Sequence, residues 1–244
     1  MPALKPTLPP GLRVYAIGDI HGRFDLLKRV LEKIDADAKT ASGPVQKIFL
    51  GDYIDRGLNS REIINYLIDW QAKEKGANAP IFLLGNHERV MLSVLKESDT
   101  VLLERWLCFG GRETMLSYGV KPSVFVESPT VALEALADKV PPAHMAFLET
   151  LKTTAEFGDY FFCHAGVRPG VPLEKQEEDD LVWIRHEFLD HGDSYGKMVV
   201  HGHSISLEAE FRPNRIGIDT GAYATGNLTA LGLEGTKQWL IQTK

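Results

Sequence analysis

Five short apolar segments, each followed by polar and glycine residues, constrain most strongly what this chain can fold into. They are rich in β-branched and aromatic residues, as buried strands are, and they cover residues 13–17, 47–50, 81–84, 160–163 and 198–200. Between the first and the second of these segments, apolar residues recur at helical spacing, for example Leu27, Leu31 and Ile34. Strands that alternate with helices predict an α/β fold.

The same patterns predict how the chain is divided. A proline-rich, extended tail is expected over residues 1–12, followed by one domain over residues 13–244. Helical periodicity dominates residues 99–158, which we expect to form a mainly helical insertion with Trp106 among its buried residues. Three further apolar segments, separated by Gly-rich turns, predict an antiparallel meander that closes the chain; they cover residues 215–219, 227–233 and 237–241.

Composition excludes several classes of protein. The 244 residues carry 27 Lys and Arg against 33 Asp and Glu, whereas general nucleic-acid binding needs clustered positive charge. No segment approaches the roughly 20 apolar residues of a membrane span, and the N-terminal residues lack the apolar region of a secretory signal. The two cysteines, Cys108 and Cys163, are too few for a disulfide scaffold. We therefore expect a cytoplasmic protein that binds neither membranes nor nucleic acids in general.

Polar motifs follow each of the five predicted strands. They are GDIHG at 18–22, GDYIDRG at 51–57, GNHE at 85–88, HAG at 164–166 and HGHS at 201–204. Any one of them could be a turn, because Asp, Asn and Gly favour turns. Together they hold five of the eight histidines, at strand ends where α/β sheets bind ligands. The motifs therefore predict one functional site.

The chemistry of these side chains predicts a metal centre. Carboxylates, an amide and imidazoles without thiolates suit Mn²⁺, iron or Zn²⁺. Six or more ligands exceed what one catalytic ion with open positions can use, which favours two ions that share a carboxylate. Such pairs hydrolyse phosphate esters. The P-loop pattern G-x-x-x-x-G-K-[ST] is absent from the sequence, which argues against a nucleotide-dependent kinase or ATPase.

In this order, the motifs resemble those of the PPP family of metallophosphatases, part of the calcineurin-like phosphoesterase superfamily. The resemblance spans residues 13–233, and IDTGA at 218–222 with GNLT at 226–229 is similar to the short bacterial and phage-type serine/threonine phosphatases. It implies a calcineurin-like fold, with a central β-sandwich flanked by helices. Leu84 stands where eukaryotic members have an arginine, and their Ser-Ala-Pro-Asn-Tyr segment is absent, so regulation like theirs is not expected.

The resemblance also implies a ligand set for two divalent ions, with Mn²⁺ the expected metal and iron or Zn²⁺ as alternatives. Asp52 would bridge both ions. Family members carry the last ligand in a Gly-His pair, which favours His203 over His201. The remaining implied ligands are Asp19 and His21 for the first ion, and Asn86 and His164 for the second.

Further roles follow from the resemblance. His87 would donate a proton to the leaving oxygen and Asp55 would orient it, while Arg56 and Arg185 would bind the phosphate. The implied mechanism is direct attack on phosphorus by a hydroxide that bridges the metals. Glu88 and the arginine after it are expected to form structural salt bridges.

Three functions remain open at this point. The first is a phosphoprotein phosphatase that acts on phosphoserine and phosphothreonine. The second is a dinucleoside tetraphosphate hydrolase, because bacterial enzymes of that kind resemble this chain in the same motifs; it would need base-stacking aromatics, which residues 99–158 could supply. The third is a catalytically silent binding module, against which the intact ligands and the Asp55–His87 pair argue. The sequence gives no indication of the oligomeric state.

Overall fold

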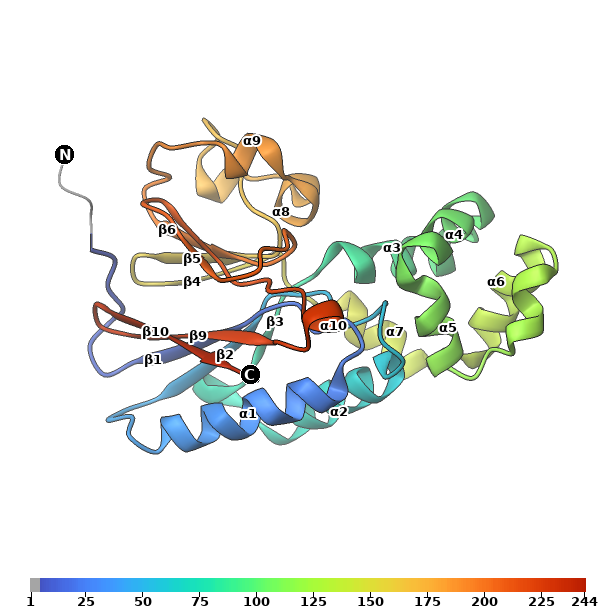
Figure 1. The fold of residues 1–244 in the computed structure, drawn as a ribbon, viewed down its shortest axis with the longest axis horizontal. Helices are drawn as coiled ribbons and strands as arrows, with labels where there is room; N and C mark the ends of the chain where they lie inside the picture. Colours follow the sequence, from blue (N-terminus) through green and yellow to red (C-terminus); the bar gives the residue numbers. More distant parts are fainter. Residues whose placement is uncertain (1–4) are drawn as a thin grey trace.

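Two five-stranded β-sheets lie face to face in the structure, a computed structural model that describes residues 5–244 (Figure 1). The first sheet has the strand order β10-β9-β1-β2-β3, with bounds Lys237–Gln242, Thr229–Glu234, Arg13–Ile17, Val45–Phe49 and Ile81–Phe82. The second has the order β4-β5-β6-β8-β7, with bounds Thr154–Phe157, Tyr160–Cys163, Met198–His201, Arg215–Gly217 and Glu210–Phe211. The expected β-sandwich is confirmed.

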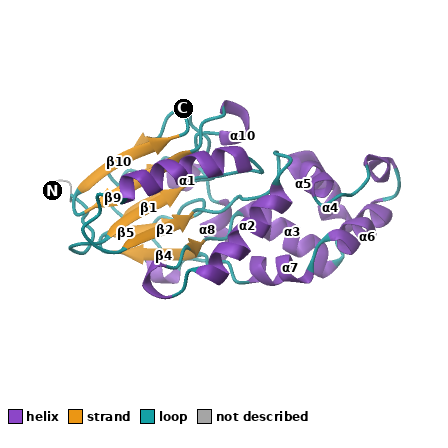
Figure 2. Ribbon diagram, turned by 90° about the horizontal axis from the view of Figure 1, so that it is seen from below, coloured by secondary structure: helices purple, strands orange, loops and turns teal. Residues whose placement is uncertain are grey.

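Helices flank the sandwich on both outer faces (Figures 1 and 2). Next to the first sheet are α1 (Phe24–Ala38) and α2 (Ser60–Lys73), and next to the second are α8 (Glu178–Trp183) and α9 (His186–Leu189). A separate helical lobe contains α3 (Asn86–Glu97), α4 (Thr100–Trp106), α5 (Arg112–Ser117), α6 (Pro129–Lys139) and α7 (Pro142–Glu149). The short helix α10 (Ala222–Thr225) precedes β9.

The central strands β1, β5 and β6 are mostly apolar because both faces of the sheets are covered there. In β1, Val14 and Ala16 point into the core between the sheets, whereas Tyr15 and Ile17 pack against the outer helices. The second sheet repeats this alternation: Tyr160 and Phe162 lie in the core between the sheets, and the intervening residue faces α8 and α9. Side chains of a strand alternate between its two faces, so burial of both faces requires an unbroken apolar run.

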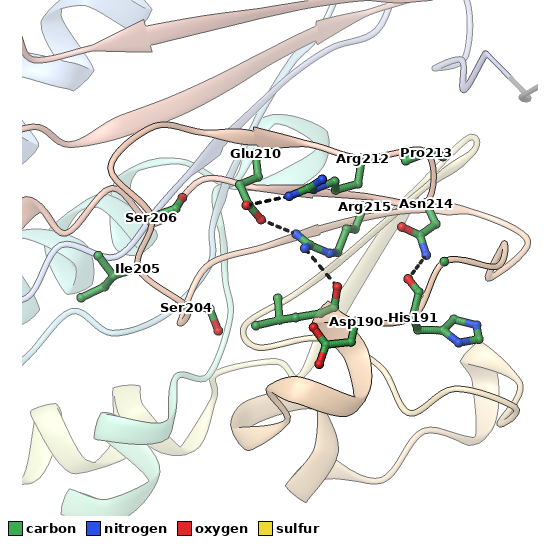
Figure 3. Close-up of a pocket in the computed structure, with 12 residues that line it drawn as sticks. Asp190, His191, Ser204, Ile205, Ser206, Glu210, Arg212, Pro213, Asn214 and Arg215 are labelled. Carbon is green, nitrogen blue, oxygen red and sulfur yellow. Dashed lines mark hydrogen bonds and ion pairs between the residues drawn. The ribbon is translucent and has the colours of Figure 1, made fainter.

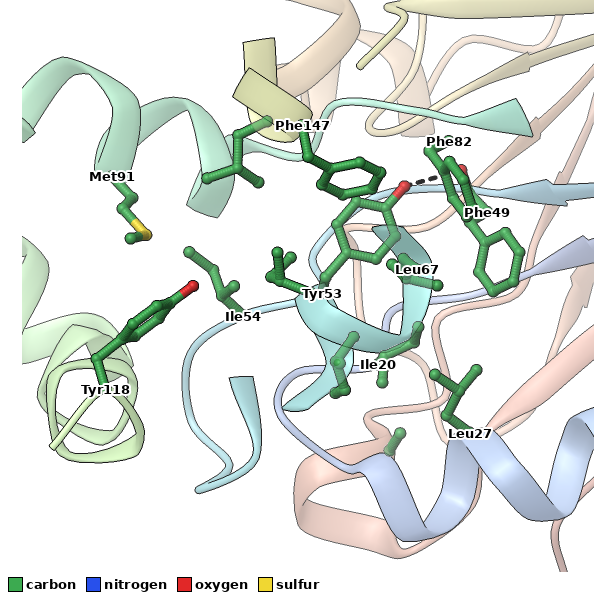
Figure 4. Close-up of a cluster of buried hydrophobic side chains, with 14 of the residues drawn as sticks. Ile20, Leu27, Phe49, Tyr53, Ile54, Leu67, Phe82, Met91, Tyr118 and Phe147 are labelled. Atoms are coloured by element: carbon green, nitrogen blue, oxygen red, sulfur yellow. Dashed lines mark hydrogen bonds between the residues drawn. The ribbon is translucent and has the colours of Figure 1, made fainter. Parts of the chain in front are cut away.

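The loop after β2 is anchored by its own apolar side chains (Figure 4). Tyr53 packs among the rings of Phe49 and Phe82, and its hydroxyl donates a hydrogen bond to the Leu83 carbonyl oxygen at 2.7 Å. Ile54, the next residue, is also fully buried. Two predicted site residues, one on each side of this apolar pair, are therefore held by the core of the domain.

The predicted C-terminal meander is wrong in part. Strands β9 and β10 do form an antiparallel pair, and β9 also pairs with β1. Strand β8, however, belongs to the second sheet, where it runs parallel to β6. The chain passes from one sheet to the other between residues 218 and 228, through α10. Apolar periodicity shows that a segment is a strand but does not reveal its pairing partner.

Two predicted boundaries also change. The range 99–158 contains β4, an edge strand of the second sheet, so only the part before it is helical. Residues 5–12 of the expected tail pack on the sandwich: Leu8 is buried between the sheets, and its N–H donates to the Gly235 carbonyl oxygen at 3.0 Å. Residues 1–4 of that tail lie outside the described residues. Within residues 5–244, no helix has the length and apolar character needed to cross a membrane.

Candidate metal centre and active site

The six residues expected to bind metal come together at the carboxyl ends of β1, β2, β5 and β6 and the start of α3. Asp52 lies at the centre of the group, with Oδ2 3.4 Å from His21 Nε2 and Oδ1 3.4 Å from His164 Nε2. Two sets of side chains have ligand atoms within 4.8 Å of one another, and Asp52 belongs to both. This arrangement suits a carboxylate shared by two ions.

The other predicted ligands complete the cluster. Asn86 Oδ1 lies 2.9 Å from His164 Nε2 and 2.9 Å from His203 Nδ1. The backbone N–H of His203 donates to Asp19 Oδ2 at 2.9 Å. Residues from both sheets thus meet at one place, although up to 184 positions separate them in the chain.

The backbone is strained at several of these residues. Six non-glycine residues within 5–244 have a positive φ, a region that is costly for side chains other than glycine. Five of the six are predicted site residues: His21, Asp52, Asp55, Arg56 and His203. Strain concentrated in this way is typical of functional sites.

Two motif glycines allow the close approach of the ligands. A Cβ atom on Gly85 would lie 2.2 Å from Asp52 Oδ1, and one on Gly202 would lie 2.0 Å from Asp19 Oδ1. Any side chain at either position would therefore displace a predicted ligand. The glycines in GNHE and HGHS thus have a packing role in addition to forming turns.

The carboxyl groups of the cluster fit bound cations. Burial, together with the charges of Asp219 and Asp52, raises the pKa of Asp19 well above its usual value. Asp19 Oδ1 and His203 Nε2 are buried, and neither has a hydrogen-bond partner among the described residues. Buried polar atoms normally have partners. Divalent ions would provide both the missing partners and the missing positive charge.

The imidazoles of the cluster are in the protonation state that metals require. Burial lowers the pKa of His21 to about 3, and burial also lowers the pKa values of His164 and His203. These rings are neutral at pH 7, so each can offer a nitrogen lone pair. The donor set of neutral imidazoles, carboxylates and an amide fits Mn²⁺, iron or Zn²⁺.

His87 lies beside this cluster and is paired with a buried carboxylate. Its Nδ1 is 2.5 Å from Asp55 Oδ2, and its Nε2 is 3.8 Å from Asp52 Oδ2 and 3.5 Å from Arg56 Nη2. Burial opposes a charge on the ring, but Asp52 and Asp55 outweigh it and raise the pKa of His87 to about 9. His87 is also close enough to Asp52 and His21 to ligate an ion, so proximity alone leaves both roles open.

Two partners of Asp55 were missed by the sequence analysis. Trp106 Nε1–H donates to Asp55 Oδ2 at 2.6 Å, and the Thr114 hydroxyl donates to Asp55 Oδ1 at 2.6 Å. Both belong to the helical lobe, 51 and 59 positions from Asp55. Trp106 was expected only as a core residue, and Thr114 has no pattern that marks it.

The two predicted phosphate-binding arginines border a groove beside His87. The Arg56 guanidinium stacks on Tyr223, with its carbon 4.6 Å from the ring centroid. The groove has a volume of about 290 Å³ and a largely apolar lining. Its lining includes three arginines and two exposed aromatic residues: Arg56, Arg105, Arg185, Phe109 and Trp183.

The prediction for Glu88 is wrong, whereas the arginine after it does form salt bridges. Glu88 is fully buried and accepts four backbone hydrogen bonds, from the N–H groups of Asp52, Tyr53, Ile54 and Gly85 at 2.8–3.1 Å. It therefore holds the loop of Asp52 against the start of α3. Arg89 pairs with the carboxylates of Glu178 and Asp179 in α8.

His201 and Asp219 lie outside the two sets of clustered ligand atoms. The His201 ring packs against Phe188, its Nδ1 lies 3.0 Å from the Gly202 carbonyl oxygen, and its Nε2 lies 3.5 Å from Arg215 Nη1. Asp219 is buried and accepts a hydrogen bond from the Gly221 N–H at 2.9 Å.

A second cavity, of about 580 Å³, lies against the loop between β6 and β8 (Figure 3). Glu210 accepts hydrogen bonds from Arg215 at 2.8 Å and from Arg212 at 3.2 Å, and Asp190 adds a second negative charge. Since its two arginines are balanced by two carboxylates, this cavity is poorly suited to a dianionic phosphate. The described residues that line it include none of the six predicted metal ligands.

The fold and the ligand cluster define a metal-dependent phosphoesterase, and a comparison with protein families agrees. A family model described as calcineurin-like phosphoesterase matches residues 12–219. The chain belongs to this family, and its relatives include enzymes of the PPP family.

Individual relatives differ in their named activities. The chain is 28% identical to the symmetrical bis(5'-nucleosyl)-tetraphosphatase of Janthinobacterium sp. (strain Marseille), over 96% of each chain. It is 27% identical to serine/threonine-protein phosphatase 2 of Salmonella typhimurium, over 88% of this chain and 90% of the relative. Among solved structures, a cold-active protein tyrosine phosphatase has a similar fold, with a TM-score of 0.60 and 18% identity over 96% of this chain and 81% of that chain.

The buried position of Glu88 generates a stability prediction. Glu88→Gln replaces one acceptor oxygen by an amide NH₂, which leaves two buried backbone N–H groups without an acceptor. We expect the free energy of unfolding in urea to fall by about 2–6 kcal/mol, since each unsatisfied group costs about 1–3 kcal/mol. Glu97→Gln, at an exposed position of the same helix, should change it by less than about 0.5 kcal/mol. Equal stability of the two variants would contradict the anchoring role.

Proposed function

We propose that this metallophosphoesterase removes phosphate from phosphoserine and phosphothreonine in proteins, in the cytoplasm and with Mn²⁺ as its preferred metal. The observation that carries the proposal is the Asp55–His87 pair beside the shared carboxylate of Asp52. Both cysteines are free thiols, which is compatible with a reducing compartment. The similarity to the Salmonella phosphatase supports the same substrate class.

The assigned roles follow from the chemistry of the substrate. A serine or threonine alkoxide is a poor leaving group and needs a proton as the bond to phosphorus breaks. His87 would donate it from Nε2, because Nδ1 is held by Asp55. Arg56 and Arg185 would bind the phosphoryl oxygens through their planar guanidinium groups.

The metal ligands in this proposal are the six residues of the cluster. Bound divalent ions would activate water for direct attack on phosphorus and neutralise the phosphoryl charge. Asp52 would be shared by the two ions, since its two oxygens face different imidazoles. The other five ligands would be Asp19, His21, Asn86, His164 and His203.

The groove beside His87 favours a second candidate, hydrolysis of dinucleoside tetraphosphates. Phe109 and Trp183 are 66% and 45% exposed at its edge, where they could stack on nucleobases. Arg56 and Arg185 would be enough to bind a single phosphate. Arg105 adds a third positive charge to the groove, which would suit a polyphosphate chain. The similarity to the Janthinobacterium tetraphosphatase supports this candidate.

Rates with two substrates test the proposal against this candidate. With Mn²⁺ present, we expect kcat/KM for a phosphothreonine peptide to exceed that for diadenosine tetraphosphate by about tenfold or more, a difference of about 1.4 kcal/mol. Trp183→Ala should then change the peptide rate little. If diadenosine tetraphosphate is the better substrate and Trp183→Ala reduces its kcat/KM by about tenfold, as loss of base stacking would, the second candidate replaces the first.

Metal removal tests the dinuclear site. Chelator treatment should abolish activity, and added Mn²⁺ should restore it. Asp52→Asn removes the negative charge shared by the two ions, so its activity should fall by about 100-fold or more, beyond what changes to outer-shell partners of metal ligands cause. Its metal content by elemental analysis should also fall. Asp69→Asn, an exposed change of the same kind, is the control. Full activity after chelation would overturn the metal assignment.

The leaving group tests the role of His87. His87→Asn should slow hydrolysis of a phosphothreonine peptide by about 10²- to 10⁴-fold, the usual contribution of a general acid. Hydrolysis of p-nitrophenyl phosphate should fall much less, because p-nitrophenolate leaves without a proton. Metal content should be unchanged, whereas Asn86→Ala should lose metal and slow both substrates. Equal slowing of both substrates with loss of metal in His87→Asn would identify His87 as a ligand instead.

A further inference from the structure

We propose that Trp106 and Thr114, two residues of the helical lobe, are positioning residues for proton transfer: they hold the Asp55 carboxylate in the single orientation that aligns His87. This inference rests on the proposed role of His87 as proton donor. It adds a part to the site, because Trp106 and Thr114 come from α4 and α5 rather than from the sandwich.

The hydrogen bonds around Asp55 leave its carboxylate no freedom to turn. The group is fully buried. Oδ2 accepts from His87 Nδ1–H at 2.5 Å and from Trp106 Nε1–H at 2.6 Å, while Oδ1 accepts from the Thr114 hydroxyl at 2.6 Å. Charge-assisted hydrogen bonds of this length are among the stronger ones in proteins. Without the two lobe residues, His87 would be the only side chain within residues 5–244 that hydrogen-bonds to the carboxylate.

The hydrogen bonds of the Thr114 hydroxyl fix the direction in which it donates. Its hydroxyl has a single hydrogen, and an ionised Asp55 can only accept it. The oxygen in turn accepts the Asp55 backbone N–H at 2.8 Å and lies 3.0 Å from the Ser60 hydroxyl, which must then be the donor. Thr114 therefore binds both the backbone and the carboxylate of Asp55.

Trp106 is held equally firmly. The indole is 2% exposed, and its ring packs directly on the backbone of Gly111, where an added Cβ would lie 2.4 Å from Trp106 Cδ2. A buried indole N–H needs an acceptor, and in this structure the acceptor is Asp55 Oδ2. The position of the N–H is thus set by packing within the lobe.

The lobe also supports the strained backbone at Asp55 and Arg56. Both residues have left-handed φ angles, 73° and 66°, which other contacts must stabilise. The Arg56 N–H donates to the Gly110 carbonyl oxygen at 3.2 Å. Gly110 has a φ of 109°, and a Cβ there would lie 2.6 Å from the Arg56 nitrogen. The lobe therefore contacts two adjacent residues of the site: Asp55, the partner of the proposed proton donor, and Arg56, which is proposed to bind phosphate.

Two variants remove the donors: Thr114→Val keeps the shape of the side chain, and Trp106→Phe keeps an aromatic ring of smaller volume. Trp106→Phe deletes the indole N–H, and Thr114→Val deletes the hydroxyl. In the metal-loaded protein, each should lower kcat for a phosphothreonine peptide by about tenfold or more, as loss of a hydrogen bond to a charged group would. The rate with p-nitrophenyl phosphate should change by less than about twofold, and metal content should stay at the wild-type level.

Matched controls separate positioning from general packing. Thr114→Ser keeps the hydroxyl and should restore the peptide rate to within about threefold of wild type. Trp239→Phe deletes another largely shielded indole N–H, one that has no hydrogen-bond partner among the described residues, and should leave both rates unchanged. Loss of the peptide rate in Trp239→Phe as well would overturn the specific role of Trp106.

A spectroscopic measurement tests the positioning independently of activity. In protein loaded with diamagnetic Zn²⁺, the His87 Nδ1–H held by Asp55 should give a downfield proton NMR signal that disappears in His87→Asn. Trp106→Phe and Thr114→Val should shift or broaden this signal, whereas Trp239→Phe should not. An unchanged signal in both lobe variants would overturn the inference.

The two readouts also separate this inference from the proposed function. If the signal responds to Trp106→Phe, but His87→Asn and Trp106→Phe slow peptide and p-nitrophenyl phosphate equally, the positioning is correct and the acid role of His87 is wrong. If His87→Asn is selective for the peptide but Trp106→Phe and Thr114→Val are not, the acid role stands and the positioning by the lobe is wrong.

Discussion

The structure depends most on the burial of carboxylates and imidazoles around Asp52. A buried charge is tolerated only where it is paired or coordinated, so the surrounding chain is organised to hold these groups at fixed distances. Glu88 satisfies four backbone N–H groups around the Asp52 loop, and Tyr53 and Ile54 anchor that loop in the core. The left-handed residues and closely packed glycines of the cluster follow from the same requirement.

The helical lobe has a larger part in the site than an insertion near a sandwich would suggest. Its α4 and α5 supply Trp106 and Thr114 to Asp55, and the exposed Phe109 between them borders the groove beside His87. The strand-end loops of the sandwich therefore carry five of the six candidate metal ligands, whereas α3 of the lobe carries the sixth, Asn86, and the proposed acid, His87.

Much of the fold could be predicted from local patterns, and the errors are of one kind. Segments apolar on both faces marked β1, β2, β5 and β6 correctly, because a doubly covered sheet requires such runs. The assignment of β8 to a C-terminal meander was wrong, and β4 was hidden in a range expected to be helical, because pairing is decided by distant parts of the chain. Leu8 was expected in a tail for the same reason: its partners lie in strands far along the sequence.

The sequence by itself determined the chemistry of the candidate centre: the order of the motifs and their Asp, Asn and His side chains predicted two ions at strand ends, since ligand type and strand position are local properties. Only the tertiary structure decided how these groups are supported. In the structure, Glu88 accepts backbone hydrogen bonds instead of forming the expected salt bridge. Trp106 and Thr114 contact Asp55 although more than 50 positions separate them from it in the chain. Contacts of this kind depend on how helices of the lobe pack against a loop of the sandwich, and no local sequence pattern encodes that packing.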